Sequence, residues 1–307
     1  MKKPRSAISQ RVIRENIKLY AMMLPVLVLI FIFCYIPMYG LVIAFQEYAP
    51  GSPFIGEGVR WVGLEHFKRF VTSIYFTRVV KNAVIFNLLD LAFGFTLPIL
   101  FALMVDMVKQ HSVKRTVLTM SYMPHFISTV IVGGMLLSFF ATDGLLTNFL
   151  TVLGLERQNW LKNSDAFRMI YTAAKTWKSF GYSSILYVAT LASIDPTLYE
   201  AAKIDGAGQL SRIWHVTLPG LMNIIIIKFI MAIGSILNEG SDLLLLIYSP
   251  STYRVADTIQ TYTYRYGIIN GAYSYSTAAG IFIAGISIVL VTIANRVSNK
   301  VTGYGLW

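Results

Sequence analysis

The stretch YEAAKIDGAGQLSRIWHVTLPG, residues 199–220, is polar and helix-forming, and it lies between two long apolar stretches. Asp195 and Pro196 stand just before it. An aspartate at the N-cap followed by proline at the first helical position is typical of a helix start. The sequence therefore predicts a short helix over 196–205 that Gly206 ends, because glycine adopts the left-handed conformation at little cost.

A second short helix is expected over 209–217, after which Pro219 opens the next apolar stretch. The two helices would form an elbow of the helix–turn–helix kind. Ala201 and Ala202 keep its first helix thin, which allows another surface to approach closely. The residues alone leave two interpretations open. The elbow either docks in a groove of a second protein or only covers one face of the membrane.

The composition indicates a polytopic membrane protein. Of the 307 residues, 55% are hydrophobic and 13% are charged, whereas a soluble domain carries roughly 25% charged residues. The single Cys34 excludes a disulfide framework and a cysteine-based zinc site. The net charge is +11, but the basic residues do not cluster into a patch with interleaved aromatic residues. The positive-inside rule explains this charge, so no nucleic-acid partner is expected.

Six apolar stretches are long enough to cross a bilayer, whose hydrocarbon core is roughly 30 Å thick. The fold class expected is an all-α membrane protein with six transmembrane helices and the elbow between the fourth and fifth. The predicted spans are 22–45, 82–105, 117–140, 170–193, 220–238 and 277–296.

The N-terminal tail, residues 1–21, carries six lysines and arginines before the first span. Positive charge next to a span favours the cytoplasmic side. With six spans both termini then lie in the cytoplasm, and so does the elbow. Residues 22–307 are expected to form a single membrane domain. The outer loops GLEHFKRFV (63–71) and GLLTNFLTVLGL (144–155) predict short interfacial helices, and the tyrosine-rich stretch 257–276 is typical of a membrane–water boundary.

Polar and aromatic residues in the spans are candidates for lining a solute path. Each charge at mid-bilayer costs about 2.5–3.5 kcal/mol on insertion scales. Lys175, Lys178 and Tyr182 follow an i, i+3, i+7 spacing that predicts one helix face. The alternative is that the lysines extend to the interface or pair internally, and Lys228 is expected to pack or pair. The full candidate set is Lys175, Trp177, Lys178, Tyr182, Asp90, Asn238 and Glu239.

Several blocks of the sequence resemble one known family. Glu-Ala-Ala at 200–202, Gly206, and Val-Thr-Leu-Pro at 216–219 resemble the signature loop of the permease subunits of binding-protein-dependent ABC importers. The form EAAKIDGA is similar to the carbohydrate branch, and other blocks resemble permeases for complex oligosaccharides of the maltose type. These blocks are YIPMYGLVIAF, NAVIFNLLDLAFGF, MPHFIS, IDPTLYEAAKIDGA and YSYSTAAGIF.

The resemblance implies a function in oligosaccharide import across the cytoplasmic membrane of a prokaryote. The elbow, residues 196–219, would be the coupling helix that sits in a cleft of a cytoplasmic ATPase subunit. The implied partners are a second, non-identical permease, two ATPase subunits that hold ATP and Mg²⁺, and an extracytoplasmic solute-binding protein. The coupling residues carried over are Glu200, Ala201, Ala202, Asp205, Gly206 and Ala207.

The chain itself is expected to be neither an enzyme nor a metalloprotein. It contains no G-x-x-x-x-G-K-[ST] loop for nucleotide phosphates. Its four histidines, His66, His111, His125 and His215, have no catalytic or metal-ligand spacing. Two alternatives remain at this point: an ABC permease for another solute, or an ion-coupled secondary transporter, which would need a charged relay in the bundle. The sequence does not name the sugar.

Overall fold

The computed structural model describes residues 10–238 and 242–307. This part of the chain is almost entirely helical, and its β-pairing is an isolated bridge between Gln46 and Trp61. It contains four helices that are long and apolar enough to cross a membrane, or five if one bent pair counts as a single span.

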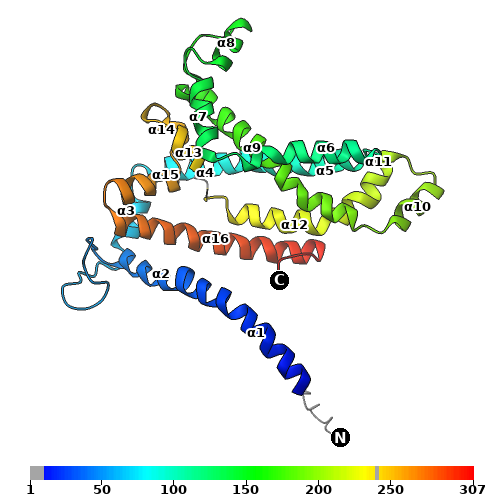
Figure 1. Ribbon diagram of the computed structural model, residues 1–307. Coiled ribbons are helices and arrows are strands. Elements are labelled where there is room, and N and C mark those ends of the chain that lie inside the picture. Colours follow the sequence, from blue (N-terminus) through cyan, green and yellow to red (C-terminus); the bar gives the residue numbers. More distant parts are fainter. Residues whose placement is uncertain (1–9, 239–241) are drawn as a thin grey trace.

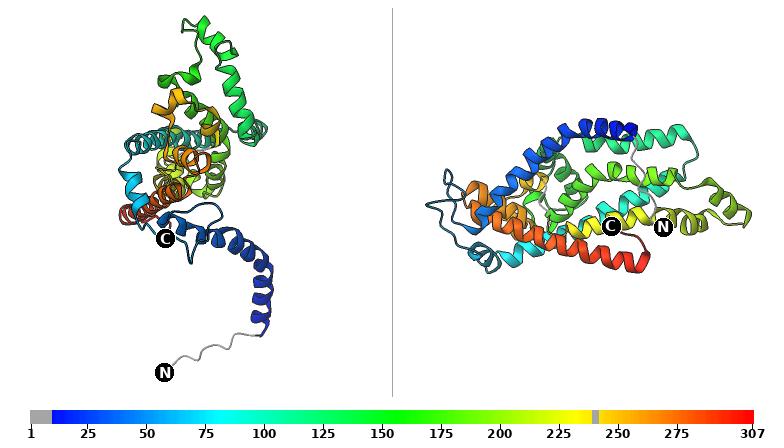
Figure 2. Two further views of the ribbon diagram at one scale, coloured as in Figure 1. Left: turned by 90° about the vertical axis from the view of Figure 1, so that its left-hand side faces the viewer. Right: turned by 90° about the horizontal axis from the view of Figure 1, so that it is seen from below.

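The first span is a helical run over Asn16–Phe45. Figures 1 and 2 show that it leaves the bundle, and its most apolar part has no buried residue. It touches the remainder mainly where its last segment packs on the C-terminal helix. Its segments are α1 (Gln10–Ile30), η1 (Phe31–Tyr35), α2 (Ile36–Met38) and η2 (Tyr39–Phe45).

The second span and the long α9 form the centre of the bundle. The second span covers Phe76–Asp106 and α9 covers Ser164–Ala192, so both are longer than predicted. α9 has 29 residues, enough to cross a bilayer, but it is not among the four apolar helices, since it is rich in serine, threonine and tyrosine and carries two lysines. The second span consists of α4 (Phe76–Leu89), η3 (Asp90–Phe95) and α5 (Thr96–Asp106), and α5 packs along α9.

The predicted span over 117–140 is a bent pair of helices in the structure. The chain forms His111–Phe126 and Thr129–Phe139, which meet at an angle of 88°. Pro124, near the end of the first helix, has no N–H to donate. Ile127 and Ser128 then take extended ψ values of 131° and 138°, so the helical hydrogen bonds are interrupted at these two residues. The elements are α6 (His111–Tyr122), η4 (Met123–Phe126) and α7 (Thr129–Phe139).

The second elbow helix is not separate from the fifth span. One helix runs from Gln209 to Gly234, and it is continuous because Pro219 lies in a turn where its missing N–H is tolerated. The helix ends four residues before the predicted end of the span. The apolar run after residue 242 forms a separate short helix. These elements are α11 (Gln209–Arg212), η6 (Ile213–Thr217), α12 (Leu218–Gly234) and α13 (Asp242–Ile247).

The remaining helices lie in the loops and at the C-terminus. The predicted loop helices are confirmed as α3 (Glu65–Val71) and α8 (Leu145–Val152), and the sixth span extends to α16 (Tyr273–Thr302). Tyr262 and Tyr275 of the tyrosine-rich stretch are buried within the protein. The short elements are η5 (Trp160–Lys162), η7 (Pro250–Thr252), α14 (Tyr253–Ala256), α15 (Ile259–Tyr264) and η8 (Arg265–Ile269).

The two ends of the bundle differ. The elbow, the turn between α5 and α6, and the end of α16 lie at one end, whereas α3 and α15 lie at the other (Figure 1). At the α15 end the fully buried Asp257 pairs with Arg265 and Arg78, at 2.7 and 3.3 Å. Asn82 of α4 donates to the Asp257 carbonyl and accepts from Arg168 of α9. This polar network ties four elements together.

Candidate functional site

A polar cavity of ≈ 360 Å³ opens between the second span, α9 and α12. It lies midway along the second span, because Asp90 stands next to the midpoint of the helix Phe76–Asp106. It is lined by Asp90, Gly94, Phe95, Pro98, Lys175, Ser179, Ser183, Tyr187, Lys228, Met231, Ala232 and Ser235.

The cavity holds an ion pair between two of the predicted residues. Lys175 Nζ lies 3.4 Å from Asp90 Oδ1. Gly94 makes room for the carboxylate, since a Cβ at that position would lie 3.0 Å from Asp90 Cγ. The pairing that the sequence left as an alternative therefore occurs, and it occurs on the wall of the cavity.

Lys228 of α12 lines the same cavity, and its side chain is half-buried. Within residues 10–238 and 242–307 its ammonium makes no hydrogen bond or ion pair. Of the two roles expected for Lys228, packing or pairing, the described residues offer no partner for pairing, and the half-burial of the side chain is consistent with packing. The sequence signal for this residue was a single lysine inside the apolar run IIIIKFIM, where a charge is costly unless it pairs or has a function.

The predicted single face of Lys175, Lys178 and Tyr182 divides into two stripes. Lys178 Nζ donates to Thr129 Oγ1 at 2.8 Å, and the Tyr182 ring stacks on His125 with centroids 3.8 Å apart. Both contacts lie at the bend between α6 and α7. Lys175 instead heads a second stripe with four-residue spacing, which faces the polar cavity: Lys175, Ser179, Ser183 and Tyr187.

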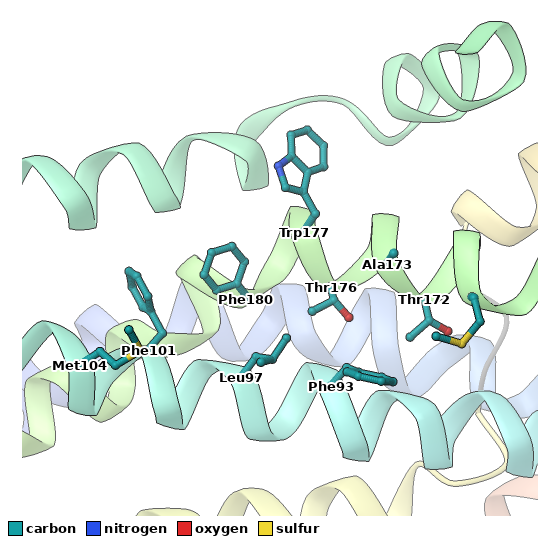
Figure 3. Close-up of a pocket in the computed structure, with 10 residues that line it drawn as sticks. Phe93, Leu97, Phe101, Met104, Thr172, Ala173, Thr176, Trp177 and Phe180 are labelled. Atoms are coloured by element: carbon teal, nitrogen blue, oxygen red, sulfur yellow. The ribbon is translucent and has the colours of Figure 1, made fainter. Parts of the chain in front are cut away.

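Trp177 does not join either stripe. It lines an apolar pocket of ≈ 440 Å³ between the second span and α9, and the residue is 43% exposed. Figure 3 shows the ring standing on the α9 ribbon, with Leu97, Phe101 and Phe180 among the neighbouring side chains. Asn238 donates to Ser287 Oγ at 3.1 Å, away from the cavity lining, and Glu239 lies outside the described residues.

The elbow has the predicted first helix, α10 (Pro196–Ile204). The Asp195 carboxylate accepts a hydrogen bond from the Thr197 N–H at 2.9 Å, which lowers the pKa of that carboxyl group. At the other end Gly206 has a φ of +74°. Ala207 N–H donates to the Ala202 carbonyl at 2.8 Å, and Gly206 N–H donates to the Lys203 carbonyl at 3.1 Å. This pair of bonds is a Schellman motif, so both ends of the short helix are capped.

The surface of the elbow is exposed and partly apolar. α10 has no buried residue, and Ile204 and Leu210 are 86% and 72% exposed. Glu200, Ala201 and Asp205 are exposed, whereas Ala202 and Ala207 are half-buried. A capped helix with large exposed apolar side chains at the tip of a bundle is typical of a contact with another protein.

Comparisons with known proteins agree over most of the chain. The family described as "Binding-protein-dependent transport system inner membrane component" matches residues 94–303. The chain is 41% identical over 291 residues to the polygalacturonan/rhamnogalacturonan transport system permease protein YteP of Bacillus subtilis (strain 168), covering 94% of this chain and 90% of the relative.

Two solved structures are similar throughout. The first is the crystal structure of a bacterial ABC transporter involved in the import of the acidic polysaccharide alginate, with a TM-score of 0.84, 39% identity, and coverage of 95% of this chain and 99% of that one. The second is a bacterial alginate ABC transporter in complex with an alginate pentasaccharide-bound periplasmic protein, with a TM-score of 0.85, 38% identity, and coverage of 97% and 99%.

Proposed function

The chain belongs to the family of binding-protein-dependent transport system inner membrane components, and from this premise we propose that it forms half of the translocation path of an oligosaccharide importer. It is a permease subunit of the ABC class. The observation that carries the proposal is the polar cavity at mid-depth, which holds charged and hydroxyl side chains inside an otherwise apolar bundle.

The cavity has the chemistry that a sugar requires. Ser179, Ser183 and Ser235 offer hydroxyl groups that both donate and accept hydrogen bonds, and Tyr187 adds an aromatic wall. Polar groups at this depth are costly unless they serve a solute or one another. Lys178, Tyr182 and Trp177, with Asn238 and Glu239, remain candidates for other parts of the path.

The elbow, residues 196–219, is proposed to couple transport to a separate ATPase subunit, on which ATP and Mg²⁺ bind. Its exposure, its double capping and its position at the tip of the bundle support this role. Glu200 would meet a basic or polar group of the ATPase. Ala201 and Ala202 would form the close contact, Gly206 would fix the bend, and Asp205 and Ala207 would flank it.

The topology proposed for the membrane has six crossings, with the bent pair α6–α7 and the polar α9 counted as spans. The elbow and both termini then lie on the cytoplasmic side of the inner membrane. The apolar surface of the first span and the pocket beside Trp177 support a second permease packed against this chain, which we propose is a non-identical one. We infer that two ATPase subunits complete the assembly, together with a solute-binding protein comparable to the periplasmic protein in the alginate transporter complex.

The test is oligosaccharide uptake by cells that produce the complete importer. Uptake should stop when ATP is depleted while the proton gradient is kept intact, and it should survive collapse of the gradient while ATP is maintained. Uptake that follows the gradient instead would contradict ATP coupling. An importer that takes up peptides or other solutes but no oligosaccharide would contradict the proposed cargo.

A further inference from the structure

A side-chain hydrogen bond crosses the inner side of the elbow. The Tyr199 hydroxyl oxygen of α10 lies 3.2 Å from Thr217 Oγ1, at the last residue of η6. Thr217 is only 3% exposed, and Tyr199 is half-buried. In the part of the chain that the structure describes, no other side-chain hydrogen bond joins α10 to the helix Gln209–Gly234.

The local backbone leaves the Thr217 hydroxyl free to accept this bond. Its oxygen also lies 3.4 Å from the Arg212 carbonyl oxygen. A carbonyl only accepts, so the threonine donates there and accepts from the Tyr199 O–H. Thr190 and Thr292 bond only to the carbonyl four residues earlier in their own helices. Thr217 lies in the wider turn of η6 and reaches across the elbow as well.

A second contact lies at the base of the elbow. Ile194 stands one residue before the N-cap of α10 and packs over Gly220 of α12, where an added Cβ would overlap the isoleucine side chain. A single contact would let α10 rotate about it, whereas two contacts at separate points fix the angle between the helices. The orientation of α10 is therefore set from α12, although α10 has no buried residue.

The helix that carries Thr217 leads to the polar cavity. Thr217 and Lys228 lie in the continuous helix Gln209–Gly234, about 16 Å apart along its axis. Lys228, Met231 and Ala232 line the cavity. A displacement of α10 that reaches Thr217 rigidly therefore moves the α12 wall of the cavity. An elbow of variable angle would absorb the same displacement.

We propose that Tyr199 and Thr217 are positioning residues of the importer, whose hydrogen bond holds the elbow at a fixed angle so that movement of α10 reaches the solute cavity. The proposal rests on the proposed function and adds to it a route from the elbow to the cavity. The exposed outer residues of the elbow contact the ATPase, and the Tyr199–Thr217 pair passes the movement inward.

The first measurement follows the elbow angle without any solute. Spin labels are attached at Lys203→Cys in α10 and Asn223→Cys in α12, which are both exposed positions. The background carries Cys34→Ser and cysteine-free partner subunits. Pulsed electron spin resonance then gives the distribution of distances between the two labels in the assembled importer. The wild type should give one narrow distribution with the same mean in the nucleotide-free and ATP-bound states.

Variants of the pair test the hydrogen bond itself. Tyr199→Phe and Thr217→Val each remove it and should broaden the distance distribution, whereas Thr217→Ser keeps the hydroxyl group and should retain the wild-type width. The variant that combines Tyr199→Phe with Thr217→Val should be no broader than either single variant, because both changes remove the same bond.

Tyr304→Phe is the matched control. Tyr304 follows α16 at the same end of the bundle (Figure 1). It bonds to Ser298 and Thr302 through its main chain, and within the described residues its hydroxyl group makes no hydrogen bond. Its loss should leave the distance distribution and transport unchanged.

The second measurement is the effect on transport. The complete importer in proteoliposomes, with its binding protein and ATP, receives trigalacturonate as the probe, and uptake and phosphate release are measured together. Tyr199→Phe and Thr217→Val should lower the uptake per ATP hydrolysed about two- to tenfold, the range that corresponds to one lost neutral hydrogen bond. ATP hydrolysis should continue in both variants, and Thr217→Ser should keep the wild-type ratio.

An unchanged distance distribution or an unchanged uptake per ATP in Tyr199→Phe and Thr217→Val would overturn the proposal. Losses that add up in the combined variant would overturn it too, because the two residues would then act separately on the structure. Failure of the wild type to import this probe or any other oligosaccharide, with the narrow distribution present, would instead contradict the proposed function.

Discussion

The Asp257 carboxylate, which is fully buried, accepts a hydrogen bond from each terminal nitrogen of Arg265, at 3.1 and 2.7 Å. Burial alone would lower the pKa of the Arg265 guanidinium, but this bidentate contact outweighs it and raises that pKa, so the arginine stays charged. Arg265 also lies over the Tyr253 ring, 4.3 Å from its centroid. The pair ties the turn before α15 to η8, which follows α15.

Removing the buried carboxylate should destabilise the chain strongly. Asp257→Ala leaves two guanidinium groups without their counterion, which costs about 3–5 kcal/mol of unfolding free energy. Glu47→Ala is the control, since its ion pair with Arg60 is exposed and contributes roughly 1 kcal/mol or less. The free energy of unfolding in mixed detergent micelles measures both. Equal losses for the two variants would show that the buried network adds no stability.

The crossing of α9 over α6 should depend on Gly181. A Cβ at this position would overlap with the Ser121 backbone carbonyl of α6, and backbone cannot move aside as a flexible side chain can. Gly181→Ala should therefore cost about 1–3 kcal/mol through overpacking. Gly285→Ala in α16 meets open space and should be neutral or slightly stabilising. Unfolding midpoints of the two purified variants distinguish them, and an unchanged midpoint for Gly181→Ala would contradict the close approach.

The sequence was sufficient for elements whose local chemistry decides their structure. Asp195, Pro196 and Gly206 predicted both ends of α10 because caps and left-handed glycine act within one helical turn. Long apolar runs located the four helices that are long and apolar enough to cross a membrane, because hydrophobicity is a property of the run itself. Hydrophobicity could not reveal the 88° break between α6 and α7, because both halves are apolar and the proline alone does not fix the angle.

The candidate site was predicted only in part, because partners across helices depend on tertiary packing. The spacing of Lys175 and Lys178 placed them on one face. In the structure Lys175 contacts Asp90 of η3 and Lys178 contacts Thr129 at the bend of α6–α7, so their partners differ. The four-residue series from Lys175 to Tyr187 was visible in the sequence and would have identified the cavity wall. Nothing in the sequence around Asp257 indicated that its carboxylate would be buried and paired with two arginines.

The acid sensitivity of the elbow should follow Asp195. Its carboxyl pKa is lowered by the hydrogen bonds from Thr197, so the charged form stabilises α10. This contribution is complete above the unfolded pKa, about 4, and is lost as the pH falls through the lower folded value. Asp195→Ala should reduce hydrogen-exchange protection of residues 197–204 at pH 7. Asp195→Asn should keep the cap but lose the acid dependence. Wild-type protection in the alanine variant would contradict the cap's contribution.

Coupling should depend on the left-handed backbone at Gly206. A side chain there costs about 1–2 kcal/mol, because its Cβ crowds the carbonyl oxygen at a φ of +74°. Gly206→Val should distort the elbow and lower the number of oligosaccharides imported per ATP hydrolysed, while the chain still inserts and assembles. Gly206→Asn should be milder, since asparagine tolerates this conformation. Gly208→Ala is the matched control two residues away, with a φ of −66° and open space for its Cβ. The measurement is sugar uptake and phosphate release in the same proteoliposomes. A normal uptake ratio in Gly206→Val would mean that the elbow does not transmit the motion of the ATPase.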